Sequence, residues 1–286
     1  MKLFNKVAII GVGLIGGSIG LAVRKRKVAG EVIGVFRRPS TMRKALKARA
    51  VSRGTLDIKE GVRRADLIVI ATPVGLIPET VLRAARFAKK GAIITDAGST
   101  KAWIVEKVEK KIGASASAHF VGSHPMAGSE QAGVESARVD LLNGSPCIIT
   151  KTAKTDHLAL KKVSRFWSAL GAKVKIMSPK EHDRSVSLVS HLPHIVAFAL
   201  AGAVPAGELE CAAEGFRDTT RIASSDPGLW ADIFTTNRKE IAKAAKLFDL
   251  YYRDIVKAIK SSRRADVVRL LAKAKSKRDK LAYGEK

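Results

Sequence analysis

The sequence predicts an α/β fold in which a mostly parallel, doubly wound sheet is followed by an all-helical domain. Short apolar runs alternate with helix-like stretches through the first two-thirds of the chain, and the first run breaks into a glycine-rich turn. From Ser178 onward every periodic pattern is helical. We therefore expect two domains, residues 1–178 and 179–286, in this chain of 286 residues.

Each element of the first domain is expected from a local pattern. Continuous apolar runs bounded by turn residues are typical of strands buried on both faces of a parallel sheet. The expected strands are residues 7–10, 31–36, 66–71 and 92–96, with three more at 119–123, 147–150 and 173–177 that extend the same sheet. Helices are expected at residues 41–50 and 78–88. Ligands of such a sheet bind at the carboxyl ends of its strands.

The second domain carries one long apolar stripe. Its members recur at alternating steps of four and three residues, as on one face of a helix: Ile241, Ala245, Phe248, Tyr252, Ile255 and Ile259. A final helix is expected from about Val267 to Leu281. Because helical domains with such stripes commonly pack against a copy of themselves, we expect a homodimer, with an intramolecular bundle as the alternative.

Composition argues against several classes of protein. The chain has 52 Lys and Arg against 26 Asp and Glu, and this net charge of +26 attracts anionic ligands. Basic residues are scattered, aromatic residues make up only 5%, and no nucleic-acid motif is present, so we expect no specific nucleic-acid partner. Cys147 and Cys211 provide no disulfide framework. The apolar stretch from Ile195 to Ala206 stops short of a membrane span. We expect a soluble, cytoplasmic protein without membrane contact.

The glycine-rich turn has the spacing Gly11-x-Gly13-x-x-Gly16 between a strand-like run and a helix-like stretch. Gly11 permits a tight turn, Gly13 lets the backbone approach a pyrophosphate, and Gly16 lets the helix pack closely on the strand. The N–H groups of the first helical turn, around Leu14 and Ile15, then face a phosphate. This context predicts a Rossmann-type dinucleotide site, with a merely structural turn as the alternative.

Polar, turn-forming segments follow the expected strands. They are Ala71-Thr-Pro-Val74, Asp96-Ala-Gly-Ser-Thr-Lys101, Ser123-His-Pro-Met-Ala-Gly-Ser-Glu130 and, in the helical half, Glu181-His-Asp183, Ser190-His-Leu-Pro-His194 and Gly215-Phe-Arg-Asp-Thr-Thr-Arg-Ile-Ala223. In this order and spacing they resemble the prephenate/arogenate dehydrogenase family of tyrosine biosynthesis. The resemblance runs from the glycine motif to about Phe234 and implies a Rossmann domain followed by a helical dimerisation domain, with Thr72 and Pro73 at the cofactor.

The resemblance implies an oxidative decarboxylation, in which a cyclohexadienol ring loses a hydride to nicotinamide and its carboxylate as carbon dioxide. His124 matches the family's catalytic histidine, and a neutral imidazole is a suitable base for the ring hydroxyl at neutral pH. Ser99 matches the serine that touches this histidine and the nicotinamide region; an N-cap for the helix near Lys101 is its alternative role. For Lys101, contact with phosphate and simple solvation remain equal alternatives.

Further matches concern the substrate. Arg221 matches an arginine that clamps a substrate carboxylate, which suits its planar guanidinium. Asp218 is expected to orient that arginine from the same helix face. His194 matches the residue that contacts the substrate side chain in relatives, and Ser129 and Ser190 are expected beside the substrate.

Trp230 matches a tryptophan that reaches toward the active site of the partner subunit. Glu130 and Asp183 match its ionic partners, which gate that site. A role in the core or at the dimer interface is the alternative for Trp230.

The first helix of the second domain carries a polar stripe. Steps of four, three and four residues place one set of side chains on a single helix face, which we expect to line the pocket: Asp183, Ser187, Ser190 and His194. Pro193 should kink the helix. His182 and His191 are expected in the core or behind the residues that contact the substrate. No metal site is expected, because no cysteine or carboxylate arrangement completes one.

The end of the second expected strand bears on the cofactor. NAD-dependent Rossmann enzymes usually carry an acid there to hold the ribose 2′-hydroxyl. This chain instead has Arg37, Arg38 and Ser40, which suit a 2′-phosphate. NADP is therefore favoured, with NAD as the alternative, because relatives with a basic residue here can still use NAD.

The leading hypothesis is a prephenate dehydrogenase that forms 4-hydroxyphenylpyruvate. An arogenate or dual-specificity cyclohexadienyl dehydrogenase is the nearest alternative. A β-hydroxyacid dehydrogenase would share the architecture but rely on a lysine in the helical domain. A nonenzymatic dinucleotide sensor or nucleic-acid-binding protein is the most distant alternative.

Overall fold

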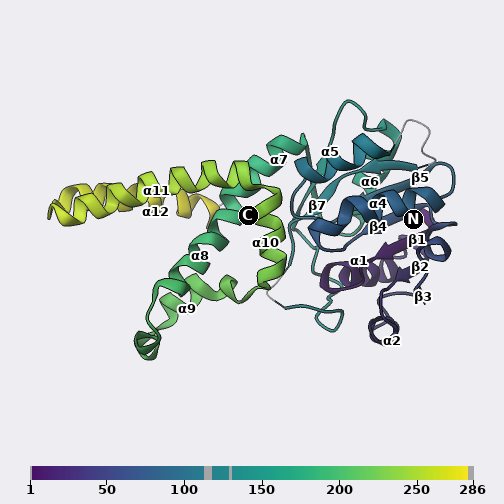
Figure 1. Cartoon of the computed structure of the whole chain (residues 1–286), viewed down its shortest axis with the longest axis horizontal. Coiled ribbons are helices and arrows are strands. Elements are labelled where there is room, and N and C mark those ends of the chain that lie inside the picture. Colours follow the sequence, from purple (N-terminus) through teal and green to yellow (C-terminus); the bar gives the residue numbers. More distant parts are fainter. Residues whose placement is uncertain (1, 113–117, 129–130, 283–286) are drawn as a thin grey trace. The chain divides into compact units, whose positions relative to one another are not determined.

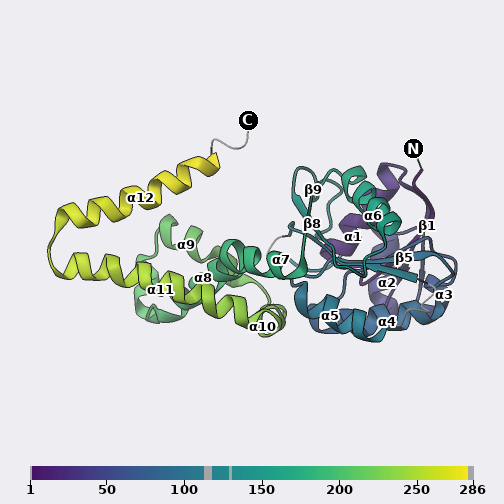
Figure 2. The ribbon, with the colours of Figure 1, turned by 90° about the horizontal axis from the view of Figure 1, so that it is seen from above.

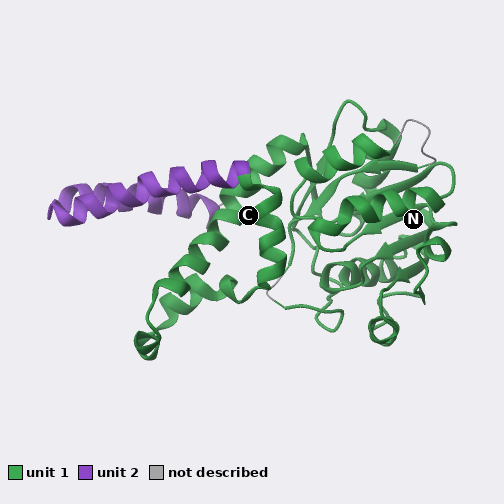
Figure 3. Ribbon diagram, viewed as in Figure 1, with its two compact units in different colours: residues 1–238 green, residues 239–286 purple. Residues whose placement is uncertain are grey.

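The computed structural model describes residues 2–112, 118–128 and 131–282. The chain divides into two compact units, residues 1–238 and residues 239–286 (Figure 3). The predicted site residues Ser129 and Glu130 lie outside the described residues.

In the part of the chain that the structure describes, six parallel strands form the main sheet of the first unit, in the order β3-β2-β1-β4-β5-β6 (Figure 1). The strands are β1 (Phe4–Ile10), β2 (Ala29–Val35), β3 (Arg53–Thr55), β4 (Leu67–Ile70), β5 (Ala92–Asp96) and β6 (Ala118–Val121). This order reverses between β1 and β4, and ligands of doubly wound sheets bind at that switch point. The predicted α/β class with a parallel sheet is confirmed; β3 was not expected.

Helices cover both faces of this sheet. Their bounds are α1 (Leu14–Lys25), α2 (Pro39–Lys47), α3 (Ile58–Val62), α4 (Ile77–Phe87), α5 (Ala102–Lys111) and α6 (His157–Ala169), with a 3₁₀ turn η1 (Val74–Leu76). Helices α1 and α6 pack on one face and α4 and α5 on the other (Figure 2). Central strands are therefore covered twice, and Val7, Ala8 and Ile9 of β1 are fully buried.

The last two strand-like runs of the first half do not extend the main sheet, contrary to expectation. Strands β7 (Ser123–Pro125), β8 (Pro146–Thr150) and β9 (Lys173–Met177) form a separate sheet within the described residues. Strand β7 pairs antiparallel with β8, and β8 pairs parallel with β9. Apolar patterning identifies a strand but not its partner, so the sequence did not distinguish the two sheets.

No strand follows Met177 among the described residues, as the helical periodicity predicted. The first unit continues with α7 (Pro179–Val186), a π-helical turn η2 (Ser187–His191), α8 (Leu192–Ala203), η3 (Ala206–Cys211), α9 (Glu214–Thr220), η4 (Arg221–Ser224) and α10 (Pro227–Thr236). Helix α7 begins with a reciprocal capping box between Ser178 and Glu181. The π-helical turn lies directly before Pro193, where the sequence predicted a kink.

The second unit holds most of α11 (Arg238–Lys260) and α12 (Arg264–Ala282). The hydroxyl of Tyr251 donates to the carbonyl of Leu270 at 2.7 Å and ties the two helices together. Several large apolar side chains of α11 are exposed, among them Leu247, Phe248, Tyr252 and Ile259.

Among the described residues, one helical stretch, Pro179–Ala203, is long and apolar enough to cross a membrane by length and composition alone. The sequence predicted only a shorter apolar stretch, from Ile195 to Ala206. Core helices of proteins that never enter a membrane share this length and composition. The stretch also carries His182, Asp183 and His191, which are buried in polar networks of the first unit.

Candidate active site

A cavity of about 590 Å³ opens at the carboxyl ends of β1 and β4, beside the sheet's switch point. Many residues singled out from the sequence line it: Gly13, Leu14, Ile15, Thr72, Pro73, Ser99, His124, Ser190, His194, Arg221 and Trp230. They come from segments far apart in the chain, which only the fold brings together. Met126, Val189 and Ile233 also line it and were not expected.

The glycine-rich turn forms one wall of the cavity. Gly11 has a φ of +91°, and a Cβ at this position would lie 2.6 Å from the carbonyl oxygen of Ala71. A Cβ at Gly16 would lie 2.2 Å from the carbonyl oxygen of Gly11, which shows how tightly α1 packs on the turn. Gly13 is different, because a Cβ there meets no protein atom within 4 Å. The geometry therefore leaves room beside Gly13, at the N-terminus of α1, for an anionic group.

Thr72 gives a second indication of a bound group. Its side-chain oxygen is buried and has no hydrogen-bond partner among the described residues. Buried polar atoms are normally paired, so an unpaired one in a cavity wall suits a polar ligand.

His124 lines the cavity and is 8% exposed. Strand β7 carries it, paired opposite Ile148 of β8, so its backbone is fixed by a sheet. Its Nδ1 lies 2.8 Å from Nε2 of His182, and Nδ1 of His182 lies 2.8 Å from Oδ1 of Asp183. The three side chains form a continuous hydrogen-bonded series that leads from the cavity into the protein.

Asp183 does not line the cavity, contrary to the predicted polar face. It is 2% exposed, and its carboxylate accepts the amides of Lys101 at 2.7 Å and Ala102 at 2.9 Å. It thus caps α5, a role that the sequence suggested as an alternative for Ser99.

Ser187, another member of the predicted polar face, is also buried away from the cavity and donates to the carbonyl of Arg184. The π-helical turn explains the difference, because its wider turn moves Ser190 and His194 out of phase with Asp183.

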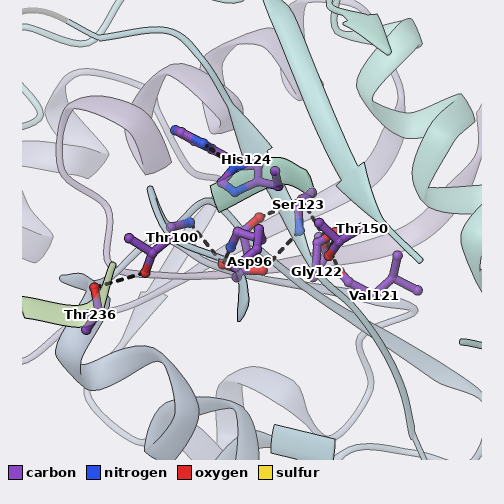
Figure 4. Close-up of polar contacts among 12 residues, drawn as sticks. Asp96, Thr100, Val121, Gly122, Ser123, His124, Thr150 and Thr236 are labelled. Carbon is purple, nitrogen blue, oxygen red and sulfur yellow. Dashed lines mark hydrogen bonds and ion pairs between the residues drawn. The ribbon is translucent and has the colours of Figure 1, made fainter. Parts of the chain in front are cut away.

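Lys101 is neither at a phosphate nor solvated, so both predicted alternatives are wrong. Its side chain is fully buried and forms an ion pair with Asp96, which is also fully buried. Asp96 further accepts the amides of Ser123 and Gly98, each at 3.0 Å. Figure 4 shows Asp96 beside Ser123, the residue before His124. Burial raises the pKa of Asp96, and Lys101 acts in the opposite direction.

Ser123 extends this polar cluster behind His124. Its hydroxyl donates to the carbonyl of Asp96 at 2.6 Å and accepts the indole N–H of Trp167 at 3.0 Å. Thr95 lies 2.7 Å from the same hydroxyl. Nearby, the hydroxyls of Thr100 and Thr236 are 3.1 Å apart and join the β5–α5 loop to α10 (Figure 4). These bonds fix the backbone that carries the histidine.

Burial shifts the titration of the histidines. Desolvation, reinforced by the charges of His182, Lys101 and His191, holds the pKa of His124 well below 6.5. The pKa of His182 is likewise well below 6.5, chiefly through desolvation and then through Lys101. Desolvation lowers the pKa of His191 to about 4. All three rings are therefore neutral at neutral pH, which is the form a general base needs.

His194 and Trp230 also line the cavity. Their rings stack with centroids 3.5 Å apart, and Nδ1 of His194 donates to the carbonyl of Ser190 at 3.0 Å. Trp230 is 8% exposed and packs against Phe234 in its own chain, and its predicted reach toward the active site of a partner subunit stays a prediction. Arg221, the first residue of η4, contributes a positive charge to the same cavity.

Several predicted residues lie outside the cavity. Asp218 is exposed on α9, which ends at Thr220, and no ion pair joins Asp218 to Arg221 in the described structure. The helix ends between them, so the same-face relation that predicted the pair does not hold. Arg37, Arg38 and Ser40 are exposed at the end of β2 and the start of α2. Over the described ranges, no cluster of metal-ligating side chains occurs.

The sequence matches two family models. The model for the nucleotide-binding domain of prephenate dehydrogenase matches residues 19–176, and the model for its dimerization domain matches residues 178–273. This chain belongs to the prephenate dehydrogenase family. The two models meet near residue 177, whereas the compact units divide after Arg238, so the domain boundary expected at residue 178 stays a prediction.

Individual members of the prephenate dehydrogenase family resemble the chain over nearly its whole length. A prephenate dehydrogenase of Bacillus subtilis is 34% identical over 99% of this chain and 77% of its own length. The crystal structure of prephenate dehydrogenase from A. aeolicus with hydroxyphenyl propionate and NAD⁺ matches with a TM-score of 0.89 and 34% identity, over 97% of this chain and 98% of its own. Synechocystis arogenate dehydrogenase matches with a TM-score of 0.81 and 29% identity, over 96% and 99%.

The glycine turn offers a matched pair of substitutions. Gly16→Ala should lower the free energy of unfolding by about 1–3 kcal/mol, because the new methyl group would overlap the Gly11 carbonyl. Gly13→Ala should leave thermal stability nearly unchanged yet weaken dinucleotide binding, because its methyl group would enter the space beside the helix N-terminus. Thermal denaturation and dinucleotide titration measure the two effects. Equal losses of stability in both variants would contradict this assignment.

The buried histidines should make the protein sensitive to acid. Each has a folded pKa below its unfolded value of about 6.5, so the unfolded chain binds more protons and stability falls as pH drops below that value. His191, with a pKa of about 4, should account for roughly 3 kcal/mol of this loss by pH 4. Denaturant unfolding across this range measures the slope. His191→Gln should lower the number of protons taken up on unfolding, which the slope reports, by about one. An unchanged slope would contradict the prediction.

Proposed function

We propose that this chain is a nicotinamide-dependent prephenate dehydrogenase, which oxidatively decarboxylates prephenate to 4-hydroxyphenylpyruvate. The observation that carries the proposal is the cavity itself. One cavity is lined by a neutral, buried histidine, a glycine turn suited to a dinucleotide and an arginine suited to a carboxylate: His124, Gly13 and Arg221. Membership of the prephenate dehydrogenase family and the likeness to an enzyme solved with NAD⁺ support it.

The roles of the chain's residues follow from their places. A bound nicotinamide dinucleotide supplies the hydride acceptor, and Gly13, the α1 N-terminus and Thr72 are the groups that would hold it. His124 would take the proton of the ring hydroxyl as hydride leaves the same carbon. Arg221 would pair with a substrate carboxylate by a bidentate contact.

His194 and Ser99 complete the proposed contacts. With its Nδ1–H donated to Ser190, His194 keeps Nε2 for the substrate, and its stack on Trp230 fixes the plane of the ring. Ser99, in the β5–α5 loop, lines the same cavity as His124. Ser99 is a candidate contact to the nicotinamide region and to the histidine.

The cavity does not favour the alternative β-hydroxyacid chemistry. Its lining contains no lysine among the described residues, although the chain is rich in basic residues. Arogenate remains a second substrate to test, because it differs from prephenate only in carrying an amino group in place of the side-chain keto group, and an arogenate dehydrogenase is among the similar structures.

We also propose NADP as the preferred cofactor. Arg37, Arg38 and Ser40 are exposed where β2 ends, and no acid occupies that strand end. Cations there would attract a ribose 2′-phosphate, whereas NAD enzymes use an acid at this point to hold the hydroxyl.

A homodimer built on the helical region is the proposed assembly. The dimerization-domain model matches there, and apolar side chains of α11 such as Phe248, Tyr252 and Ile259 are exposed. A cytoplasmic location stays a prediction.

The activity is tested by following reduced nicotinamide with prephenate and with arogenate, each with NAD and with NADP. We expect turnover of prephenate, and His124→Asn should lower kcat by about 100-fold or more, because it removes the base. Gln131→Ala, in the same cavity but without a titratable group, is the control for general disturbance. Absence of turnover in all four combinations, in a folded protein that binds dinucleotide, would refute the function.

Cofactor preference is tested with a double variant, Arg37→Asp with Arg38→Asp. Replacing two cations by acids should raise KM for NADP by about 10-fold or more and improve use of NAD, because an acid repels the 2′-phosphate and accepts from the 2′-hydroxyl. Both side chains are exposed, so stability should change little. Equal KM values for NADP in the variant and the original protein would contradict the proposed role.

A further inference from the structure

His182 makes more specific contacts than a side chain that only fills space in the core would need. Both of its ring nitrogens are engaged, one with His124 and one with Asp183, although the ring is fully buried. His182 does not line the cavity, but His124, to which it is hydrogen-bonded, does. Its hydrogen bonds therefore reach the catalytic candidate from behind.

The hydrogen bonds have a direction that the geometry determines. Both oxygens of Asp183 accept backbone amides, those of Lys101 and Ala102, so the carboxylate acts as an acceptor. His182 must then donate its Nδ1–H to Asp183. A neutral imidazole that donates from Nδ1 can only accept at Nε2.

The same logic extends to His124. Since Nε2 of His182 accepts, Nδ1 of His124 must carry the proton and donate it across 2.8 Å. A neutral His124 with a proton on Nδ1 has its lone pair on Nε2. This is the ring nitrogen opposite His182, and His124 lines the cavity where His182 does not.

We propose that His182 is a positioning residue that, together with Asp183, holds His124 as the Nδ1–H tautomer and so reserves Nε2 for the proton of the substrate. The inference deepens the proposed dehydrogenase function and rests on it for the identity of that proton. When His124 accepts the proton at Nε2, its Nδ1–H stays bonded to a neutral acceptor, and Asp183 behind that acceptor stabilises the positive charge. No proton moves beyond His124 in this scheme.

Other charged groups near the pair do not provide the same function. Lys101 is committed to Asp96 and, as a cation, opposes protonation of both His124 and His182. His191 lies 3.2 Å from the side-chain amide of Asn237 through its Nδ1, and its ring packs against Trp230. Cys147 is buried, and desolvation raises the pKa of its thiol, so it stays neutral. The acceptor for Nδ1–H of His124 is thus His182.

Two substitutions separate the two bonds of His182. Gln places an amide oxygen near the position of the imidazole Nε2, so His182→Gln keeps an acceptor for His124. Asn is shorter and reaches only the position of Nδ1, so His182→Asn keeps the bond to Asp183 and loses the bond to His124. His191→Gln is the matched control, because it removes a neighbouring buried histidine that does not touch His124.

The first readout is the tautomer of His124 by ¹⁵N NMR of histidine-labelled dimer without substrate, with the signals assigned by their loss in His124→Asn. We expect Nδ1–H in the original protein, in His182→Gln and in His191→Gln. His182→Asn should shift the ring toward Nε2–H, the tautomer that lacks a base on the cavity side. An Nε2–H tautomer in the original protein, or an unchanged tautomer in His182→Asn, would overturn the proposal.

The second readout is steady-state kinetics with prephenate. His182→Asn should lower kcat by roughly 10-fold or more while KM changes less than about 3-fold, because a wrong tautomer impairs the proton transfer and not binding. His182→Gln should recover most of kcat. A loss shared equally by His182→Gln and His182→Asn, with equal losses of thermal stability, would show a merely structural role.

The two readouts also separate this proposal from the proposed function. The NMR experiment needs no substrate, so the tautomer is measured whether or not prephenate is turned over. An original protein that is inactive with prephenate and arogenate but shows the Nδ1–H tautomer would refute the dehydrogenase function and support the hydrogen-bond arrangement. An active enzyme whose His124 is the Nε2–H tautomer would support the dehydrogenase function and refute the proposed hydrogen-bond arrangement.

Discussion

The buried carboxylate of Asp183 is the contact on which the arrangement of the cavity depends. It accepts the amides of Lys101 and Ala102, where α5 would otherwise leave N–H groups unpaired, and it also accepts from His182. A negative charge at a helix N-terminus is favourable, which compensates part of the cost of burying it. Because α7 carries Asp183 and α5 follows strand β5 of the sheet, this contact joins the helical segment to the segment that bears the sheet. Asn237 adds a bond to the carbonyl of Asp183 at 2.9 Å and secures the same junction from α10.

The buried ion pair of Lys101 and Asp96 is the second interaction that positions the residues of the cavity. Removing two charges from water is costly, and a buried pair persists only where further hydrogen bonds satisfy its atoms. Here two backbone amides complete the shell of Asp96. One of them belongs to Ser123, so the pair also fixes the strand end from which His124 projects. The pair fixes the backbone position of the strand and places a positive charge near His124. It therefore contributes more to the geometry of the site than to the free energy of unfolding.

The sequence predicted the parts of this structure that depend on local patterns. Apolar runs and the glycine motif predicted the parallel sheet, the turn and the site at its carboxyl edge, and helical periodicity predicted the second half. The prediction failed where a long-range partner decides the outcome: Lys101 is indistinguishable from a solvated lysine until Asp96 is seen beneath it. Ideal helical spacing predicts Asp183 in the cavity, but the π-helical turn changes the phase of the helix. His182 could not be singled out from the sequence, because a histidine next to an acid in the chain gives no indication of its bond to a distant histidine before the fold is known.

A catalytic base must satisfy two opposing requirements, and the surroundings of His124 address them separately. Desolvation and the charge of Lys101 keep the ring neutral before reaction, and the net charge of +26 acts in the same sense while it attracts an anionic substrate. The same forces would penalise the imidazolium that forms when the proton arrives. A neutral hydrogen-bond acceptor that is itself bonded to a carboxylate meets both requirements. It places no charge directly beside the ring in the resting state, and its interaction with the ring becomes more favourable as positive charge develops there. The series His124, His182 and Asp183 has this property, since the hydrogen bond at Nδ1 strengthens as Nε2 takes up the proton. Burial thus sets the resting state of the base, while the hydrogen-bonded series lowers the energy of the protonated state in which the base acts.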